Sequence, residues 1–318
     1  FNPKLIGNYS NQYGRVVTTL GADFTDTTYD AEIAGASIER SNDQKIDSYY
    51  AQVIVPVASD TLVTLGGRNA KVKNNLTDLT AFPSGQEINS SVTVFSAGIS
   101  KQIKSYRVFV RYDENFRFAK VDEQVFTETG TIGLETQEGK SKEIGIEYKK
   151  GDIDLALLVY RLDITNEIAF DPTVDGPFGV GTGANVNFDA TLREGVIIKL
   201  GNQITKRLKL GLAYSILNSE FKSGIFTGNT ISGIPKKIIR LSSDYQFNKH
   251  WNIFLEAQHN GNQYFTGDNN NASEKQASYT VSNLSINYQH KSWSLSGRVN
   301  NLNNRNYSES TNSFGSVN

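Results

Sequence analysis

The sequence predicts an all-β fold, an antiparallel up-and-down transmembrane β-barrel, from three observations. Apolar and polar residues alternate with a period of two along most of the 318 residues, while helical periodicity is almost absent. The connections between the alternating segments are short and long in turn, as in barrels with short periplasmic turns and long outer loops. Aromatic residues make up 11% of the chain and cluster near the segment ends, where membrane proteins carry aromatic girdles.

The alternation predicts about thirteen strands. In the fifth, Val108 and Val110 fall on one face, while Arg107 and Arg111 fall on the other. In chain order the predicted strands lie near residues 15–25, 46–57, 61–72, 91–102, 105–115, 142–149, 153–168, 187–200, 206–218, 236–247, 250–262, 277–289 and 292–302. Seven apolar residues of the later strands are expected to face lipid: Leu208, Leu210, Leu212, Ile239, Leu241, Ile253 and Leu255.

The connections fall into two classes by length. The short ones are expected in the periplasm and the long ones outside the cell. A soluble β-sandwich also alternates, but nothing in that fold sorts its loops by length, so the membrane barrel is favoured. The short connections are Ala58–Asp60, Ile103–Lys104, Lys150–Asp152, Gly201–Thr205, Asn248–Lys249 and His290–Lys291. The long ones are 26–45, 73–90, 116–141, 169–186, 219–235 and 263–276.

The composition excludes several classes of function. With 32 Lys and Arg against 33 Asp and Glu, the net charge of -1 argues against nucleic acid as a partner, because that binding needs a basic face. The absence of Cys excludes thiol catalysis, iron–sulfur clusters and Cys-ligated zinc. The three histidines are apart in sequence, and no Gly-x-Ser-x-Gly motif occurs. We therefore predict no enzyme activity, no catalytic residue, no metal ligand and no cofactor.

Several short segments resemble motifs of the β-barrel region of TonB-dependent outer-membrane receptors, and they occur in the family's order. They are Tyr50–Val53 with Asp60–Arg68, Val94–Ser100 with Tyr106–Phe118, Gly133–Thr136 before Lys142–Gly145, Asp163–Ile168, Leu192–Val196, the strand after Pro235, and Val299–Tyr307. Two features depart from the family pattern. Ile197 stands where the family usually has Glu, so a role for that carboxylate does not carry over, and the sequence ends at Asn318 without a closing strand that finishes in an aromatic residue.

The resemblance implies a barrel of about 22 strands with an N-terminal plug. On that basis residues 1–318 are expected to be a partial barrel domain, with one strand after Asn318 and roughly eight strands and the plug before Phe1. The open edges of the sheet are then expected near residues 15–25 and 292–302. The resemblance further implies a Gram-negative outer-membrane location, contact with lipid, and coupling to the TonB complex through the plug.

The function implied by the resemblance is active transport of a scarce nutrient. An iron–siderophore complex is the first expectation, with cobalamin, haem or another small cofactor behind it. The small number of histidines argues mildly against haem, which often takes axial His ligands. The alternative from a different class is a passive outer-membrane channel or an adhesive surface barrel without energy coupling.

Two sets of residues are candidates for ligand binding. Arg68, Arg111, Arg240 and Arg298 occupy predicted inward positions, where a guanidinium could bind an anionic substrate. The alternative is that the inward charges pair with each other, with water or with the plug. Phe126, Phe178, Tyr264 and Phe265 lie in long loops and could form a ligand platform, or could pack within their own loops. The Gly-rich run at Gly176–Gly181 is interpreted as a flexible outer loop.

Overall fold

The computed structural model describes residues 1–33, 38–78 and 82–308 of the chain. These residues form one sheet of fourteen antiparallel strands, ordered β1 to β14 as in the sequence. The strands are β1 (Lys4–Asn11), β2 (Gly14–Ile33), β3 (Ile38–Ala58), β4 (Thr61–Asp78), β5 (Phe82–Ile103), β6 (Tyr106–Arg117), β7 (Gln137–Lys150), β8 (Ile153–Asp171), β9 (Ala184–Thr205), β10 (Leu208–Phe221), β11 (Lys237–Gln246), β12 (Trp251–Asn260), β13 (Tyr279–His290) and β14 (Trp293–Val299). Among the described residues, no helix is long and apolar enough to cross a membrane.

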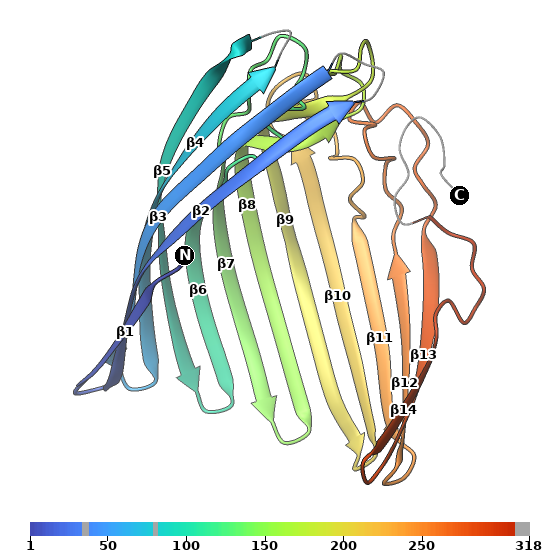
Figure 1. Ribbon diagram of the computed structural model, residues 1–318. Coiled ribbons are helices and arrows are strands. Elements are labelled where there is room, and N and C mark those ends of the chain that lie inside the picture. Colours follow the sequence, from blue (N-terminus) through green and yellow to red (C-terminus); the bar gives the residue numbers. More distant parts are fainter. Residues whose placement is uncertain (34–37, 79–81, 309–318) are drawn as a thin grey trace.

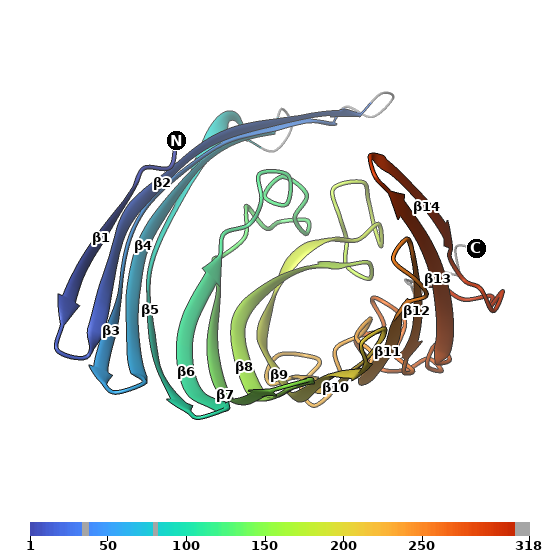
Figure 2. The same ribbon diagram turned by 90° about the horizontal axis from the view of Figure 1, so that it is seen from below.

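The sheet curls into an open trough with the loops that follow β6 and β8 inside the curve (Figure 2). In the described chain, β1 and β14 are the two edges and are not hydrogen-bonded to each other. The first edge therefore differs from the expected one near residues 15–25, because β1 pairs with β2 from Lys4↔Gly21 to Asn11↔Gly14. The sequence missed β1 because Gly7 and Asn8 interrupt its alternation and all eight of its residues are exposed.

The outer face of the sheet is a continuous apolar belt. Val110 lies opposite Ile144, Ile144 opposite Val159, and Val159 opposite Val196, so one strand after another presents an aliphatic side chain at the same height. These side chains lie on the open surface of the sheet, where Ile144 is 62% exposed. A soluble protein would bury such a surface, whereas lipid covers it in a membrane.

The residues predicted to face lipid lie on this outer face. Leu212 is opposite Leu241, while Leu210 and Leu255 both lie opposite Ser243. Leu210, Leu241 and Leu255 are exposed, and none of the seven predicted residues belongs to a buried core cluster in the described chain. The period of two therefore identified the lipid-facing side correctly, because successive side chains of a strand point to opposite faces.

The short turns gather at one end of the sheet and the long connections at the other (Figure 1). Several turns use a left-handed backbone, with φ of 59° at Asp60, 54° at Lys104, 56° at Gly151 and 51° at Lys291. The predicted turn at Gly201–Thr205 is wrong. There β9 continues to Thr205, which pairs with Leu208 across a two-residue turn and a register shift.

The first two predicted long loops are mostly strand. Residues 26–45 and 73–90 fall largely within β2 to β5, which have 20, 21, 18 and 22 residues and extend beyond the other strands (Figure 1). The pairing continues through polar residues, for example Asp26↔Lys45 and Arg40↔Asp78. Backbone hydrogen bonds and opposite charges on facing strands contribute to the ladder here, where few residues are apolar.

A small buried core lies on the inner face beneath the long hairpins. Ala70, Val72, Val92 and Val94 project inward from β4 and β5 and pack with Phe118, which follows β6. The pairing between β5 and β6 ends at Ser96↔Asp113, and the chain after β6 turns into the trough instead of following β5 outward. The inner core therefore places residues 118–136 inside the mouth of the sheet.

Candidate ligand-binding site

Three successive inward side chains of β3 hold the segment 118–136 against the sheet. Arg40, Asn42 and Gln44 are two residues apart, so they point to the same face. Each donates a hydrogen bond to a backbone carbonyl of the segment. The accepting oxygens belong to Val125, Val121 and Ala119, at 2.7, 3.1 and 2.9 Å respectively. We call these three residues the β3 clamp.

Two residues of the clamp, Asn42 and Gln44, are buried and are hydrogen-bonded to the neighbouring strand β4. Asn42 and Gln44 also donate to Asn74 Oδ1 on β4, at 3.1 and 2.8 Å. Asn42 and Asn74 have no exposed surface, and Gln44 is nearly as buried. Buried amides are costly unless they are hydrogen-bonded, so these side chains have few alternative positions. The clamp therefore fixes where the segment 118–136 lies.

The segment 118–136 is also joined to the connection between β8 and β9 and to the start of β9. Asn185 donates its backbone N–H to Phe126 O at 2.8 Å, and Thr129 donates its backbone N–H to Asp175 O at 2.9 Å. Within the segment, the Gln124 side chain bonds both backbone groups of Leu134, accepting from N at 2.7 Å and donating to O at 3.3 Å. The two connections thus form one loop unit, which β3 supports.

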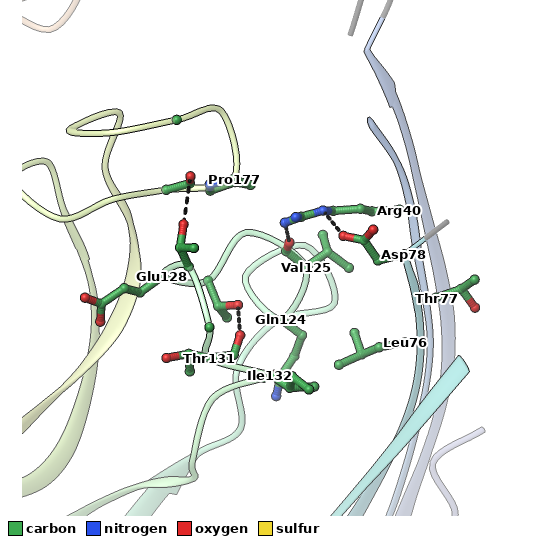
Figure 3. Close-up of a pocket in the computed structure, with 16 residues that line it drawn as sticks. Arg40, Leu76, Thr77, Asp78, Gln124, Val125, Glu128, Thr131, Ile132 and Pro177 are labelled. Atoms are coloured by element: carbon green, nitrogen blue, oxygen red, sulfur yellow. Dashed lines mark hydrogen bonds and ion pairs between the residues drawn. The ribbon is translucent and has the colours of Figure 1, made fainter. Parts of the chain in front are cut away.

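A cavity of about 480 Å³ lies between this loop unit and the long hairpins (Figure 3). Arg40 and Asp78 form an ion pair on one wall, with Nε and Oδ2 2.7 Å apart. The other walls carry threonine hydroxyls, backbone groups of several glycines and a few aliphatic side chains. The lining includes Leu76, Thr77, Gln124, Val125, Thr127, Glu128, Thr129, Thr131, Ile132, Gly176 and Gly179. Its volume and mixed lining are those of a small-molecule site.

An aromatic row belongs to the same loop unit. The rings of Tyr29 and Phe126 lie 6.1 Å apart, and those of Phe126 and Phe178 lie 5.7 Å apart. Phe178 is 50% exposed, so one end of the row is open to solvent. The structure thus brings together three aromatic residues of segments predicted as long loops, of which Tyr29 lies on β2.

The comparisons with known proteins agree with this architecture. The family model described as TonB dependent receptor-like, beta-barrel, matches residues 2–302. The chain belongs to this family. TonB-dependent receptors lie in the outer membrane of Gram-negative bacteria, so the apolar belt is the lipid-facing surface of an outer-membrane barrel. The sequence resemblance, the fold class and the location are therefore confirmed.

Solved structures show the same fold at low sequence identity. The siderophore receptor PiuA from Acinetobacter baumannii is 15% identical with a TM-score of 0.79, over 98% of this chain and 52% of that one. The ferric-catecholate import receptor Fiu from K12 E. coli is 15% identical with a TM-score of 0.72, over 98% and 51%. The copper transporter OprC is 13% identical with a TM-score of 0.74, over 96% and 51%. This chain spans about half the length of these structures. No curated protein matches the sequence significantly.

The other two predicted aromatic residues belong to a second loop unit of this receptor chain. The connections 222–236 and 261–278 are joined by Asn271, which accepts from Thr230 N at 2.7 Å and donates to Thr230 O at 2.9 Å. Here Lys275 Nζ lies 4.6 Å from the ring centre of Tyr264, and Phe265 accepts a backbone hydrogen bond from Asp268. Tyr264 and Phe265 therefore do not line the cavity.

The four predicted arginines of the receptor wall do not converge on one point. They lie on β4, β6, β11 and β14, and each contacts a residue nearby. Arg68 binds Asp23 at 2.8 Å, Arg111 binds Asp113 at 2.5 Å, Arg240 binds Gln258 at 2.6 Å, and Arg298 binds Asn300 at 2.7 Å. Each of the four therefore has a partner on the described wall, and Arg240 also lies 3.5 Å from Glu256 on β12. Their role in ligand binding stays a prediction.

Pairing with carboxylates is general among the arginines of this inner wall. Arg40, Arg68, Arg107, Arg111, Arg117, Arg193 and Arg240 each lie within 4 Å of a carboxylate oxygen, on Asp78, Asp23, Glu147, Asp113, Glu123, Glu167 and Glu256 respectively. The sequence analysis missed Arg40 because residues 26–45 were predicted as a loop. Their alternation, with Arg40, Asn42 and Gln44 on one face, was the signal that could have identified it.

Proposed function

We propose that the chain is the latter part of the barrel of a TonB-dependent receptor that imports an iron–siderophore complex. The observation that carries the proposal is the cavity formed by a clamped loop unit at the long-connection end, with the aromatic row beside it. Such a cavity meets the ligand before it enters the barrel. The siderophore and ferric-catecholate receptors among the structural neighbours support this ligand class.

The chemistry of the cavity suits a ligand rich in oxygen. Thr127 and Thr129 already donate their hydroxyls to Thr131 O and Gly176 O, and Gly176 and Gly179 donate their N–H groups to each other's carbonyls. The threonine hydroxyls that would serve a ligand are therefore those of Thr77 and Thr131. Arg40 uses Nε for Asp78 and Nη1 for Val125 O, and a guanidinium has five N–H donors, so others remain for a ligand. Phe178 does not line the cavity, but it lies between Pro177 and Gly179, which do, so its exposed ring offers an apolar contact beside the cavity.

The proposal extends to the whole receptor. A plug, earlier strands and a closing strand would complete the barrel, and TonB would act on the plug. Arg68, Arg111, Arg240 and Arg298 remain proposed contacts further along the wall, where ligand or plug could compete for their present partners. Membership of a TonB-dependent family favours this proposal over the passive channel.

The test is uptake by the full-length receptor in a deletion strain starved of iron. Arg40→Ala and Phe178→Ala should each reduce uptake of iron-labelled siderophore at limiting concentration by about tenfold, the effect of roughly 1.4 kcal/mol. Arg161→Ala is the matched control, because Arg161 pairs with Asp163 on exposed strand surface away from the cavity.

Three results would contradict the proposal. Uptake that persists in a strain lacking TonB would indicate a passive channel. Copper accumulation without siderophore uptake would indicate that copper is the transported species, as for the copper transporter OprC. Equal uptake by the Arg40 and Arg161 variants would show that the cavity does not bind the ligand.

A further inference from the structure

Two of the three histidines meet at the short-turn end of the sheet. His250 ends the turn between β11 and β12, and His290 is the last residue of β13. They are far apart in sequence, but the pairing of β12 with β13 makes the two turns neighbours. Their ring centres lie 4.6 Å apart, with an angle of 57° between the ring planes. Both side chains are half-buried.

We propose that His250 and His290 form a binding site for a divalent transition metal, with Cu²⁺ as the best-fitting ion. Imidazole is a good ligand for Cu²⁺, and among first-row divalent ions Cu²⁺ binds most tightly to a given nitrogen and oxygen site. The site lies at the periplasmic turns, at the opposite end of the barrel from the ligand cavity. It is independent of the proposed function.

The hydrogen bonding of His250 fixes the nitrogen that would bind the metal. Nδ1 lies 2.8 Å from the carbonyl oxygen of Gln289, and a carbonyl can only accept. Nδ1 therefore carries the proton in the neutral ring, and Nε2 has a free lone pair. Metal-binding histidines commonly donate their second N–H to a carbonyl in this way, which sets the tautomer and orients the ring.

The backbone holds the same ring in place. Gln289 donates its N–H to His250 O at 2.8 Å, so His250 and Gln289 are joined twice. Asn248 Oδ1 accepts from the backbone N–H of His250 at 2.9 Å and from that of Trp251 at 3.1 Å, which closes the turn. His250 is thus preorganised, and His290 follows Gln289 directly in the chain.

The separation of the rings fits coordination of one ion. A metal–nitrogen distance of about 2.0 Å places each ring centre about 3.2 Å from the ion, and two ligands at a right angle then have centres about 4.5 Å apart. The observed 4.6 Å agrees with this arrangement. A right angle between neighbouring ligands is the square geometry that Cu²⁺ prefers, with water in the remaining positions.

The groups around the two histidines add little to the affinity for Cu²⁺ beyond the coordination bonds themselves. In the described chain no third His, Asp or Glu joins the pair, and a lysine is the chain neighbour of each histidine, Lys249 before His250 and Lys291 after His290. These lysines oppose the approach of a cation. The ring centre of Tyr288 lies 5.9 Å from that of His250 and 6.5 Å from that of His290, so Tyr288 packs beside the pair. A bound ion would join the β11–β12 turn to the β13–β14 turn.

The test is titration of the full-length receptor in detergent with Cu²⁺, followed by calorimetry and electron paramagnetic resonance. The parent should bind one Cu²⁺ with nitrogen ligands that His250→Gln or His290→Gln removes, with at least a tenfold loss of affinity. His259→Gln is the matched control, since His259 bonds Thr280 Oγ1 at 3.0 Å within the β12–β13 pair and should not contribute.

A second measurement separates metal binding from damage to the fold. Because an ion that binds the folded state alone raises its stability, Cu²⁺ should raise the Tm of the parent and of His259→Gln. It should leave the Tm of His250→Gln and His290→Gln unchanged, while all four proteins share one Tm without metal. Undiminished Cu²⁺ affinity in the His250 and His290 variants, or an equal loss in His259→Gln, would overturn the proposal.

Discussion

Truncation of the β3 clamp should release the segment 118–136 from the sheet. The clearest single change is Gln44→Ala. Gln44 is 6% exposed, and its Nε2 donates to Asn74 Oδ1 at 2.8 Å and to Ala119 O at 2.9 Å. Only the bond to Ala119 O joins the segment to the sheet, and a hydrogen bond contributes about 1 kcal/mol net, so the segment should lose about 1 kcal/mol of local stability. A tenfold change corresponds to about 1.4 kcal/mol, which predicts about fivefold faster local opening.

Amide hydrogen exchange measures this opening directly. The amides of residues 118–136 should exchange about fivefold faster in Gln44→Ala, while those of β8 to β10 keep their parental rates. Asn42→Ala should act in the same direction, because it removes bonds to the same acceptor and to Val121 O. Thr28→Val is the control, since it loses a bond to Asp43 without touching the segment. Equal exchange in Gln44→Ala and Thr28→Val would refute the clamp.

Three further predictions concern the barrel wall. Leu210→Arg should cost about 2–4 kcal/mol in refolding into liposomes if Leu210 lies near the bilayer midplane, and a cost near zero would contradict the lipid-facing assignment. On intact cells, a Cys at Gly130 should react with an impermeant label and one at Asp152 should not; the reverse pattern would invert the topology. Gly145→Ala should destabilise the barrel by about 1–3 kcal/mol in urea, because the ring of the residue opposite on β6 occupies the space of the new methyl group. Gly297→Ala, which meets nothing within 4 Å, should unfold like the parent.

The membrane-spanning part of the fold could be predicted from the sequence because each of its strands faces lipid on one side and a polar interior on the other. Lipid outside and a polar interior force each side chain of a strand such as β6 or β11 into one of two classes, and the period of two results. This constraint ends beyond the membrane. There β2 to β5 continue through Asp, Asn, Thr and Lys, and polarity alone made residues 26–45 resemble a loop.

The candidate site was less predictable, because it depends on contacts between residues far apart in sequence. Phe126 and Phe178 were chosen as loop aromatics, but only the folding of two connections onto each other brings them together. The arginines were identified as inward, yet the carboxylates that pair with them come largely from other strands and depend on register. The meeting of His250 and His290 likewise follows from strand pairing alone.

The pairing of arginine with carboxylate along the inner wall has a consequence for how cargo moves. Opposite charges a few ångströms apart form compact dipoles whose fields decay rapidly with distance, and salt screens what remains. In the proposed receptor, a charged solute passing this part of the wall would meet a succession of shallow, local attractions instead of one deep well. Such a surface would guide the solute without trapping it.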